Sequence, residues 1–264
     1  MKERLIGGFF VAVVTFVMLL SGGIVSAVVL TLVSLGGVYE FLKVYGLEKS
    51  SFAVADYIGT IVYYLLMYFH REALLFPVII MILMIVLAIY VLRFPKYSDQ
   101  QMTKAFVGFF YVTVMLSHVY KVRSMEAGLL LACFILISSW GNDVFAYLVG
   151  SAIGKHKFSP KVSPNKSVEG FFGGLLGAGL LGFGVAMAFR DIIPFEPIYC
   201  GVIAALGAVP AVIGDLAASA IKRDNEIKDY GHLIPGHGGI LDRFDSVIFT
   251  APIIYYLVDL FNVL

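Results

Sequence analysis

Residues 219–245 read SAIKRDNEIKDYGHLIPGHGGILDRFD, and long apolar runs lie on both sides of this polar, glycine-rich stretch. A chain that is otherwise so apolar has no structural need for such a segment. Basic side chains that can hold phosphates come first, a flexible His-Gly-Gly turn follows, and two carboxylates three residues apart end the stretch. This order predicts a metal-assisted site for a polyphosphate substrate, which the rest of the chain places at a membrane surface.

The composition indicates an integral membrane protein. The chain has 264 residues, of which 60% are hydrophobic and 14% are charged, and its mean hydropathy is +0.92. A soluble domain normally carries about 25% charged residues. Cys133 and Cys200 lie far apart in apolar surroundings, which favours two buried thiols over a disulfide or a metal site.

Nine apolar runs approach the length of about 20 residues that spans a bilayer core. Each is apolar all round, as lipid-embedded helices are, and Asp56 lies near the start of the third. The first run follows two basic residues, but only a three-residue turn separates it from the second, which suits a retained helical hairpin. The predicted helices are Leu5–Leu20, Gly23–Leu42, Ala53–Phe69, Ala73–Val91, Ala105–Val119, Ala127–Gly150, Phe171–Phe189, Tyr199–Ile221 and Phe244–Val263.

The basic residues predict the orientation. With nine helices, 15 of the 19 lysines and arginines fall on the side of the amino terminus, and only Arg71, Lys121, Arg123 and Arg190 fall on the other. Positive charge accumulates on the cytoplasmic side of membrane proteins. We therefore expect a multi-pass protein of the cytoplasmic membrane, with its amino terminus inside, its carboxyl terminus outside, and its two longest polar connections in the cytoplasm.

Four carboxylates lie in or at the ends of the last apolar helices, at Asp143, Asp215, Asp242 and Asp245. A carboxylate inside a membrane helix is costly and usually functional. All four can share one depth near the cytoplasmic side, although acids at a helix start, such as the last two, can also cap it. The predicted fold is an all-α polytopic membrane protein with about nine transmembrane helices and a polar catalytic site at the cytoplasmic ends of the last four.

The spacing of these residues favours a shared site. Asp215, Ser219 and Lys222 follow one stripe of a helix, and Asp242 and Asp245 are three residues apart on one face. Carboxylate oxygens on neighbouring helix faces suit Mg²⁺, which is usually held by one or two carboxylates and by substrate phosphates.

Two loops add further polar groups. His237 lies between glycines, so it either contacts a phosphate through an approaching backbone or forms hydrogen bonds within its loop. In residues 154–170, two Ser-Pro pairs stiffen the chain and Ser167 is typical of a helix start. The lysines there can face anionic lipid heads, but Lys166 is placed in the site. The glycines from Gly170 to Gly184 are interpreted as helix packing.

Residues 219–245 closely resemble the signature of phosphatidate cytidylyltransferases, also called CDP-diacylglycerol synthases. The matching positions are Ser219, Lys222, Arg223, Lys228, Asp229, Gly231, Pro235, His237, Gly238, Gly239, Asp242, Arg243 and Asp245. Asp143 and residues 163–170 also look like this family, with Ser167 where Thr is expected. The likeness covers roughly the second half, so we expect about five amino-terminal helices in 1–120 and a catalytic region in 121–264.

The resemblance implies the transfer of CMP from CTP to phosphatidate, giving CDP-diacylglycerol and pyrophosphate, in the bilayer and without nucleic acid. Mg²⁺ is the implied cofactor, and a second cation and a homodimer are left open. The implied metal ligands are Asp143, Asp215, Asp242 and Asp245. The implied catalytic residues are Asp215, Asp242, Asp245, Lys166 and His237. The implied substrate-binding residues are Ser219, Lys222, Arg223, Lys228, Asp229, Gly238, Gly239, Arg243 and Asn165.

Two other functions compete with this interpretation. CDP-alcohol phosphatidyltransferases also use membrane carboxylates, but their pattern opens with Asp-Gly, a dipeptide that this chain lacks. An ion-coupled transporter would use carboxylates as ion ligands near the midplane, and it predicts interrupted helices in both halves. Here the strong polar features lie in the second half.

Overall fold

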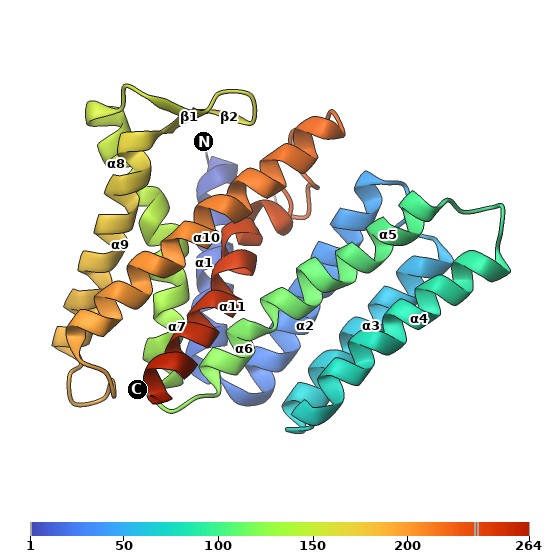
Figure 1. The fold of residues 1–264 in the computed structure, drawn as a ribbon, viewed down its shortest axis with the longest axis horizontal. Helices are drawn as coiled ribbons and strands as arrows, with labels where there is room; N and C mark the ends of the chain where they lie inside the picture. The colour runs from blue at the N-terminus through green and yellow to red at the C-terminus, as the bar shows by residue number, and fades with distance from the viewer. Residues whose placement is uncertain (1, 235, 237, 264) are drawn as a thin grey trace. The chain divides into compact units, whose positions relative to one another are not determined.

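The computed structural model describes residues 2–234, 236 and 238–263, with side chains given for 7–9 and for the described residues from 11 to 261. Helices make up nearly all of it (Figure 1). The first half contains α1 (Lys2–Ser21), α2 (Gly23–Val44), α3 (Ser51–Tyr68), η1 (Glu72–Leu74), α4 (Leu75–Leu92), α5 (Asp99–Gly108), η2 (Phe109–Val114) and α6 (His118–Arg123). The second half contains α7 (Gly128–Leu136), η3 (Ile137–Gly141), α8 (Asn142–Ile153), β1 (Lys157–Ser159), β2 (Ser163–Ser167), α9 (Val168–Ala188), α10 (Pro197–Asp224) and α11 (Leu241–Val263).

The predicted all-α membrane architecture is confirmed. Within the described residues, eight continuous helical stretches of 18 to 28 residues are long and apolar enough to cross a membrane. They correspond to the last eight predicted spans, and the 20-residue α1 corresponds to the first. Large apolar side chains face outward, among them Leu92 at 82% exposure and Leu180 at 71%. Such a surface suits lipid, because soluble monomers rarely expose large contiguous apolar patches.

Two of these stretches contain a turn of π-helix. The first is η2, which continues α5, and the second is η3, which joins α7 to α8. π-Helical turns are rare and often lie at functional sites. The sequence analysis did not predict either, because hydropathy fixes the length of a span but not its hydrogen-bonding pattern.

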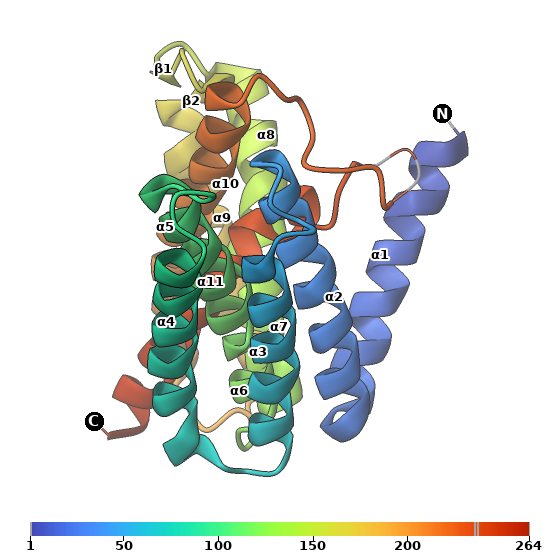
Figure 2. The ribbon, with the colours of Figure 1, turned by 90° about the vertical axis from the view of Figure 1, so that its right-hand side faces the viewer.

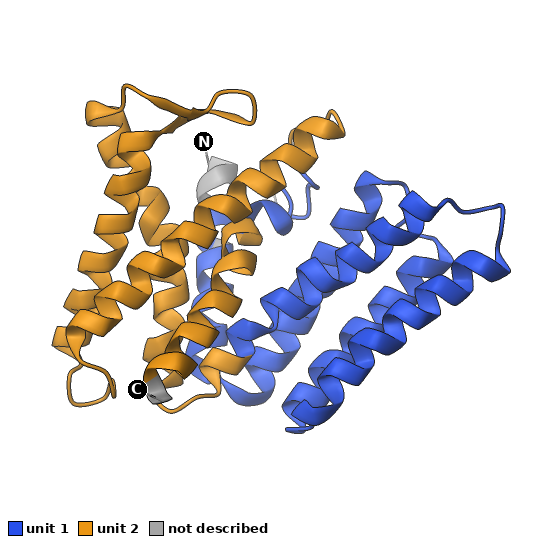
Figure 3. Cartoon of the chain, in the orientation of Figure 1, with its two compact units in different colours: residues 1–120, 229–243 blue, residues 121–228, 244–264 orange. Residues whose placement is uncertain are grey.

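The chain divides into two compact units (Figure 3). Unit 1 contains residues 1–120 and 229–243, and unit 2 contains residues 121–228 and 244–264. The first boundary falls where the predicted catalytic region begins, but residues 229–243 of the signature pack with the amino-terminal helices. The functional division into 1–120 and 121–264 stays a prediction.

Unit 1 is built from α1 to α5, with neighbouring helices side by side (Figure 2). Aromatic rings fill its core, where Tyr63 lies edge-on to Phe109. Residues 229–243 return to α2, whose Gly37 lies against Leu241: a Cβ added at this glycine would come within 3.2 Å of the leucine side chain. The small residues of α2 therefore let the signature loop lie close to the helix.

In unit 2, α9 packs along both α8 and α10 (Figure 1). Its glycines make this close approach possible. A Cβ at Gly173 would meet Val149 of α8 at 2.5 Å, and one at Gly182 would meet Ala204 of α10 at 2.6 Å. The interpretation as packing residues is confirmed for these two glycines, whereas a Cβ at Gly184 would meet nothing within 4 Å.

A two-stranded antiparallel hairpin, β1–β2, lies between α8 and α9 where the sequence predicted only a stiffened loop. Lys157 pairs with Ser167, and Ser159 pairs with Ser163. The predicted helix start is confirmed, because the Ser167 hydroxyl caps α9 by accepting a hydrogen bond from the Gly170 N–H at 3.1 Å. The hairpin thus fixes Asn165 and Lys166 just before the helix.

Candidate active site

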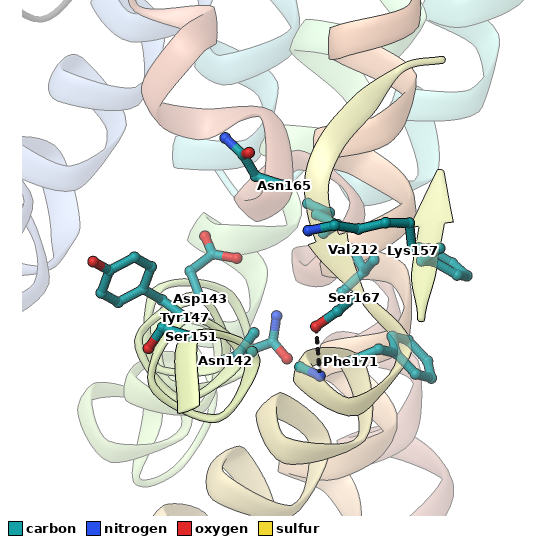
Figure 4. Close-up of a pocket in the computed structure, with 14 residues that line it drawn as sticks. Asn142, Asp143, Tyr147, Ser151, Lys157, Asn165, Ser167, Phe171 and Val212 are labelled. Carbon is teal, nitrogen blue, oxygen red and sulfur yellow. Dashed lines mark hydrogen bonds between the residues drawn. The ribbon is translucent and has the colours of Figure 1, made fainter. Parts of the chain in front are cut away.

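Unit 2 contains a cavity of about 420 Å³, lined by polar and apolar residues together. The α8 helix contributes Asp143 and Tyr147, the hairpin contributes Lys157, Asn165 and Lys166, and α9 and α10 supply further walls. Figure 4 shows Asp143 and Tyr147 on one side of this space and Ser167 and Phe171 on the other. The cavity is therefore lined by anionic, cationic and amide groups together, within a chain that is otherwise strongly apolar.

An ion pair joins the hairpin at the cavity to α10. The Lys166 Nζ lies 2.6 Å from Oδ2 of Asp215, and the two side chains are 23% and 31% exposed. Asp143 interacts electrostatically with both of them. The ammonium therefore neutralises a pair of carboxylates that would otherwise repel each other.

Asp245 brings a third carboxylate to this group. It lies on α11, is only 9% exposed, and its Oδ1 accepts a hydrogen bond from the Ser246 N–H at 2.7 Å. Its electrostatic partners include Asp215, Asp143 and Lys222. Three acids so placed need compensating cations, and two lysines lie near them.

The predicted stripe on α10 is present. The Ser219 hydroxyl donates to Oδ1 of Asp215 at 3.4 Å, which places the two side chains on one face. Arg223 and Lys228 are exposed at the end of α10 and in the segment after it, and among the described residues neither forms an ion pair with a site carboxylate. The substrate-binding roles of these two basic residues stay predictions.

The remaining described signature residues lie in unit 1. Oδ2 of Asp242 accepts hydrogen bonds from the backbone N–H groups of Tyr230 and Gly239, each at 2.9 Å. Gly238 has a φ of +82°, a backbone conformation that favours glycine, and lies against Asp229. Asp242 thus organises the glycine turn, as a helix-start acid can, and its role as a metal ligand stays a prediction.

Two further predicted residues complete the set. Arg243 follows Asp242 in the first turn of α11 and belongs to unit 1. His237, the predicted phosphate contact, lies outside the described residues, as does Pro235 of the signature. On either side of them, the Ile234 N–H donates to the Gly238 carbonyl at 3.0 Å and closes the turn.

Sequence reasoning missed Asn142 and Glu40. Asn142 is fully buried beside Asp143 at the cavity, and neither of its side-chain polar atoms makes a well-aligned hydrogen bond to another described residue. Glu40 of α2 is 1% exposed and accepts the Leu241 N–H at 2.9 Å. Both could have been noticed in the sequence. Asn142 directly precedes an acid inside a predicted membrane span, and Glu40 is an acid inside another predicted span.

The described residues contain no group of three His, Cys, Asp or Glu side chains placed to hold a metal ion by themselves. This does not conflict with the donor chemistry, since Mg²⁺ commonly takes one or two carboxylates and completes its shell with water and substrate phosphate. Oδ2 of Asp215 instead contacts the ammonium of Lys166. A cation therefore already occupies one of the oxygens that a metal would use.

Comparison with known proteins decides the family. A model of the cytidylyltransferase family matches residues 2–261. The chain belongs to the cytidylyltransferase family. It is 30% identical to a phosphatidate cytidylyltransferase of Bacillus subtilis (strain 168), over 99% of each chain, and 32% identical to one of Staphylococcus aureus (strain COL), over 97% of this chain and 98% of that protein. An uncharacterized protein of Escherichia coli (strain K12), YnbB, is 36% identical over 58% of this chain and 52% of its own length.

Membership in the cytidylyltransferase family confirms the predicted resemblance and a nucleotidyltransferase enzyme. The family match covers the whole chain, whereas the motifs recognised in the sequence lay in its second half. The amino-terminal helices are therefore part of the family's architecture. Neither a CDP-alcohol phosphatidyltransferase nor an ion-coupled transporter is favoured by these comparisons.

Proposed function

We propose that this cytidylyltransferase-family protein transfers CMP from CTP to phosphatidate in the membrane. A phosphate oxygen of phosphatidate attacks the α-phosphorus of CTP, the bond to the β-phosphate oxygen breaks, and the products are CDP-diacylglycerol and pyrophosphate. The observation that carries the proposal is the Lys166–Asp215 pair: Lys166 lines the cavity with Asp143, and Asp215 interacts electrostatically with Asp143 and Asp245. The names of the two full-length relatives support the same reaction.

The principal barrier to this reaction is electrostatic, because two anions must meet and a third must leave. Fixed positive charge aimed at the transferring phosphoryl group lowers such a barrier. Lys166 is held at the cavity by the hairpin and by the start of α9, so its ammonium can exchange Asp215 for a substrate phosphate with little backbone movement. Lys222 supplies a second positive charge near Asp245.

Mg²⁺ is the cofactor that this donor set suits. Asp215 and Asp245, with Asp143 beside them, would hold it, and the resemblance implies that Asp242 contributes as well. When bound, the ion would neutralise charge on the CTP phosphates and help to align them. Carboxylates that repel one another without it would then be compensated, and Lys166 would be free to serve the substrate.

We further propose that the site faces the cytoplasm, from which CTP would enter, and that the protein lies in the cell's inner membrane. The partition of basic residues supports this orientation. Asn165, Ser219, Arg223, Lys228 and Arg243 remain proposed contacts to the substrate phosphates.

A labelled-nucleotide assay tests the function. Purified protein in mixed micelles receives CTP that carries radiolabel in its α-phosphate, with phosphatidate, with diacylglycerol, or with no acceptor. We expect label in an organic-soluble product with phosphatidate alone, and loss of this product when EDTA removes divalent cations. Transfer to diacylglycerol, or no transfer to phosphatidate by folded protein, would contradict the proposal.

A further inference from the structure

A side chain of α2 binds the backbone at the start of α11. The backbone N–H of Leu241, the first residue of α11, donates to Oε2 of Glu40 at 2.9 Å, and the backbone of Ile240 interacts electrostatically with the same carboxyl group. Glu40 lies on α2, 201 residues earlier in the chain. The first N–H groups of a helix have no partners within it and favour an anionic acceptor. Glu40 therefore acts as the cap of α11.

The loop before α11 closes tightly around this side chain. A Cβ added at Gly231 would lie 2.9 Å from Cδ of Glu40, and one added at Gly239 would lie 2.6 Å from the same atom. The carboxyl group is thus held between two glycines of the signature. The signature's small residue at position 231 has a physical reason here, because a larger side chain would displace Glu40.

A second acid secures the same loop. Oδ2 of Asp242 accepts the N–H groups of Tyr230 and Gly239, so it joins the beginning of the loop to its end. Glu40 holds the adjoining residue Leu241. The glycine turn and the first turn of α11 are consequently fixed by two carboxylates, one local and one from α2.

Burying the Glu40 carboxyl group costs free energy that its packing does not recover. Glu40 is 1% exposed inside a predicted membrane span, where a carboxyl group pays a large desolvation cost. A leucine would fill the space at lower cost but would leave the N–H groups of α11 without an acceptor. Packing alone therefore does not explain the residue.

We infer that Glu40 is a positioning residue for the proposed cytidylyl transfer: it sets the first turn of α11, and with it Asp242 and the Gly238–Gly239 turn. This inference rests on the proposed function. It assigns to the amino-terminal helices a specific part in catalysis, although Glu40 touches neither substrate nor reacting atoms. Its action runs through the backbone of residues 239–241.

The first experiment compares Glu40→Ala with Glu40→Gln, because glutamine keeps the volume and one acceptor oxygen. We expect kcat/KM to fall about 10- to 100-fold for alanine, the range for removing the acceptor of buried donors, and to recover largely in the glutamine variant. Asp56→Asn is the matched control, since Asp56 is an equally buried acid of unit 1 that accepts no hydrogen bond from the described part of the loop. Equal loss of activity in the alanine and glutamine variants would count against positioning.

Hydrogen exchange gives a readout independent of turnover. In Glu40→Ala, amides of residues 229–243 should exchange faster, while peptides from α3 and α4 keep their wild-type rates. Asp56→Asn should not show this local change. Faster exchange throughout unit 1 would mean that Glu40 only stabilises the unit, and unchanged exchange in the loop would overturn the inference.

A double variant tests the contact itself. Gly231→Ala should impair the wild-type protein because its methyl group meets Glu40, and it should cost much less in the Glu40→Ala background, where that space is open. Additive losses would contradict the contact. The two proposals can fail separately: if the wild-type protein transfers no CMP, the function is wrong, whereas full activity of Glu40→Ala in an active protein refutes only the positioning role.

Discussion

Replacing Lys166 by alanine tests the proposed site most directly. The ammonium lies 2.6 Å from Oδ2 of Asp215, with both side chains about one-quarter to one-third exposed. Partly exposed ion pairs contribute up to about 1 kcal/mol to stability, because solvent screens them and ordering the side chains costs entropy. Loss of a charge that stabilises a transition state costs about 2.7–4 kcal/mol, or about 10²–10³ in kcat. Activity should therefore fall far more than stability.

Replacing Lys166 should also change the apparent affinity for Mg²⁺, and in a direction that can be predicted. In the free protein the Lys166 ammonium and a metal ion compete for Oδ2 of Asp215, so removing the ammonium should leave the apparent Mg²⁺ affinity equal or higher while kcat falls. Lys166→Arg keeps the charge but brings a planar fork that does not reproduce a point charge, and it should recover only part of the rate. Steady-state CDP-diacylglycerol formation at varied CTP and Mg²⁺ measures both quantities.

Lys161→Ala is the matched control for Lys166. Lys161 lies in the same hairpin segment, is exposed, and does not line the cavity. Its removal should leave kcat/KM near that of the wild-type protein. If Lys166→Ala and Lys161→Ala behave alike in folded protein, Lys166 serves lipid heads and the proposed site loses its main cation.

Asp215→Asn and Asp245→Asn should each lower kcat by about 10²-fold or more, and the double variant should be little worse than the poorer single because residues that act as a unit are not additive; additive losses in purified protein would separate their roles. In a protein whose native cysteines are replaced, a cysteine at Lys161 should resist a membrane-impermeant thiol reagent in intact cells and one at Arg190 should react, and the reverse pattern would overturn the orientation. Ser167→Ala removes the cap of α9 and should lower the free energy of unfolding by about 1 kcal/mol, whereas Ser167→Thr keeps the hydroxyl; equal thermal shifts in the two variants would argue against capping.

The hydropathy of the sequence was enough to predict most of the fold. Lipid requires the backbone of each crossing segment to satisfy its own hydrogen bonds, so a long apolar run in this chain could only be a helix. The spans predicted at 171–189 and 199–221 therefore match α9 (Val168–Ala188) and α10 (Pro197–Asp224) to within a few residues. The family was also readable from sequence, because the signature fixes many residue types at fixed distances.

The hairpin and the partner of the signature loop could not be predicted in the same way. The strands β1 and β2 are 3 and 5 residues long, and a proline interrupts the second, so no alternating pattern marks them. Glu40 is a single acid in an apolar run and has no spacing to link it with residues 229–243. Its role depends on a contact between segments about 200 residues apart, which one sequence does not reveal.

The π-helical turn η3 sets the rotation of α8 relative to α7 within one continuous span. An α-helix advances by about 100° per residue, since it has about 3.6 residues per turn, and a π turn accommodates one residue beyond the regular repeat. If the same residues formed a regular α-helix instead, the face of α8 that carries Asp143 would be rotated by about 100° relative to α7. The register of this span, more than its composition, sets the direction in which Asp143 points.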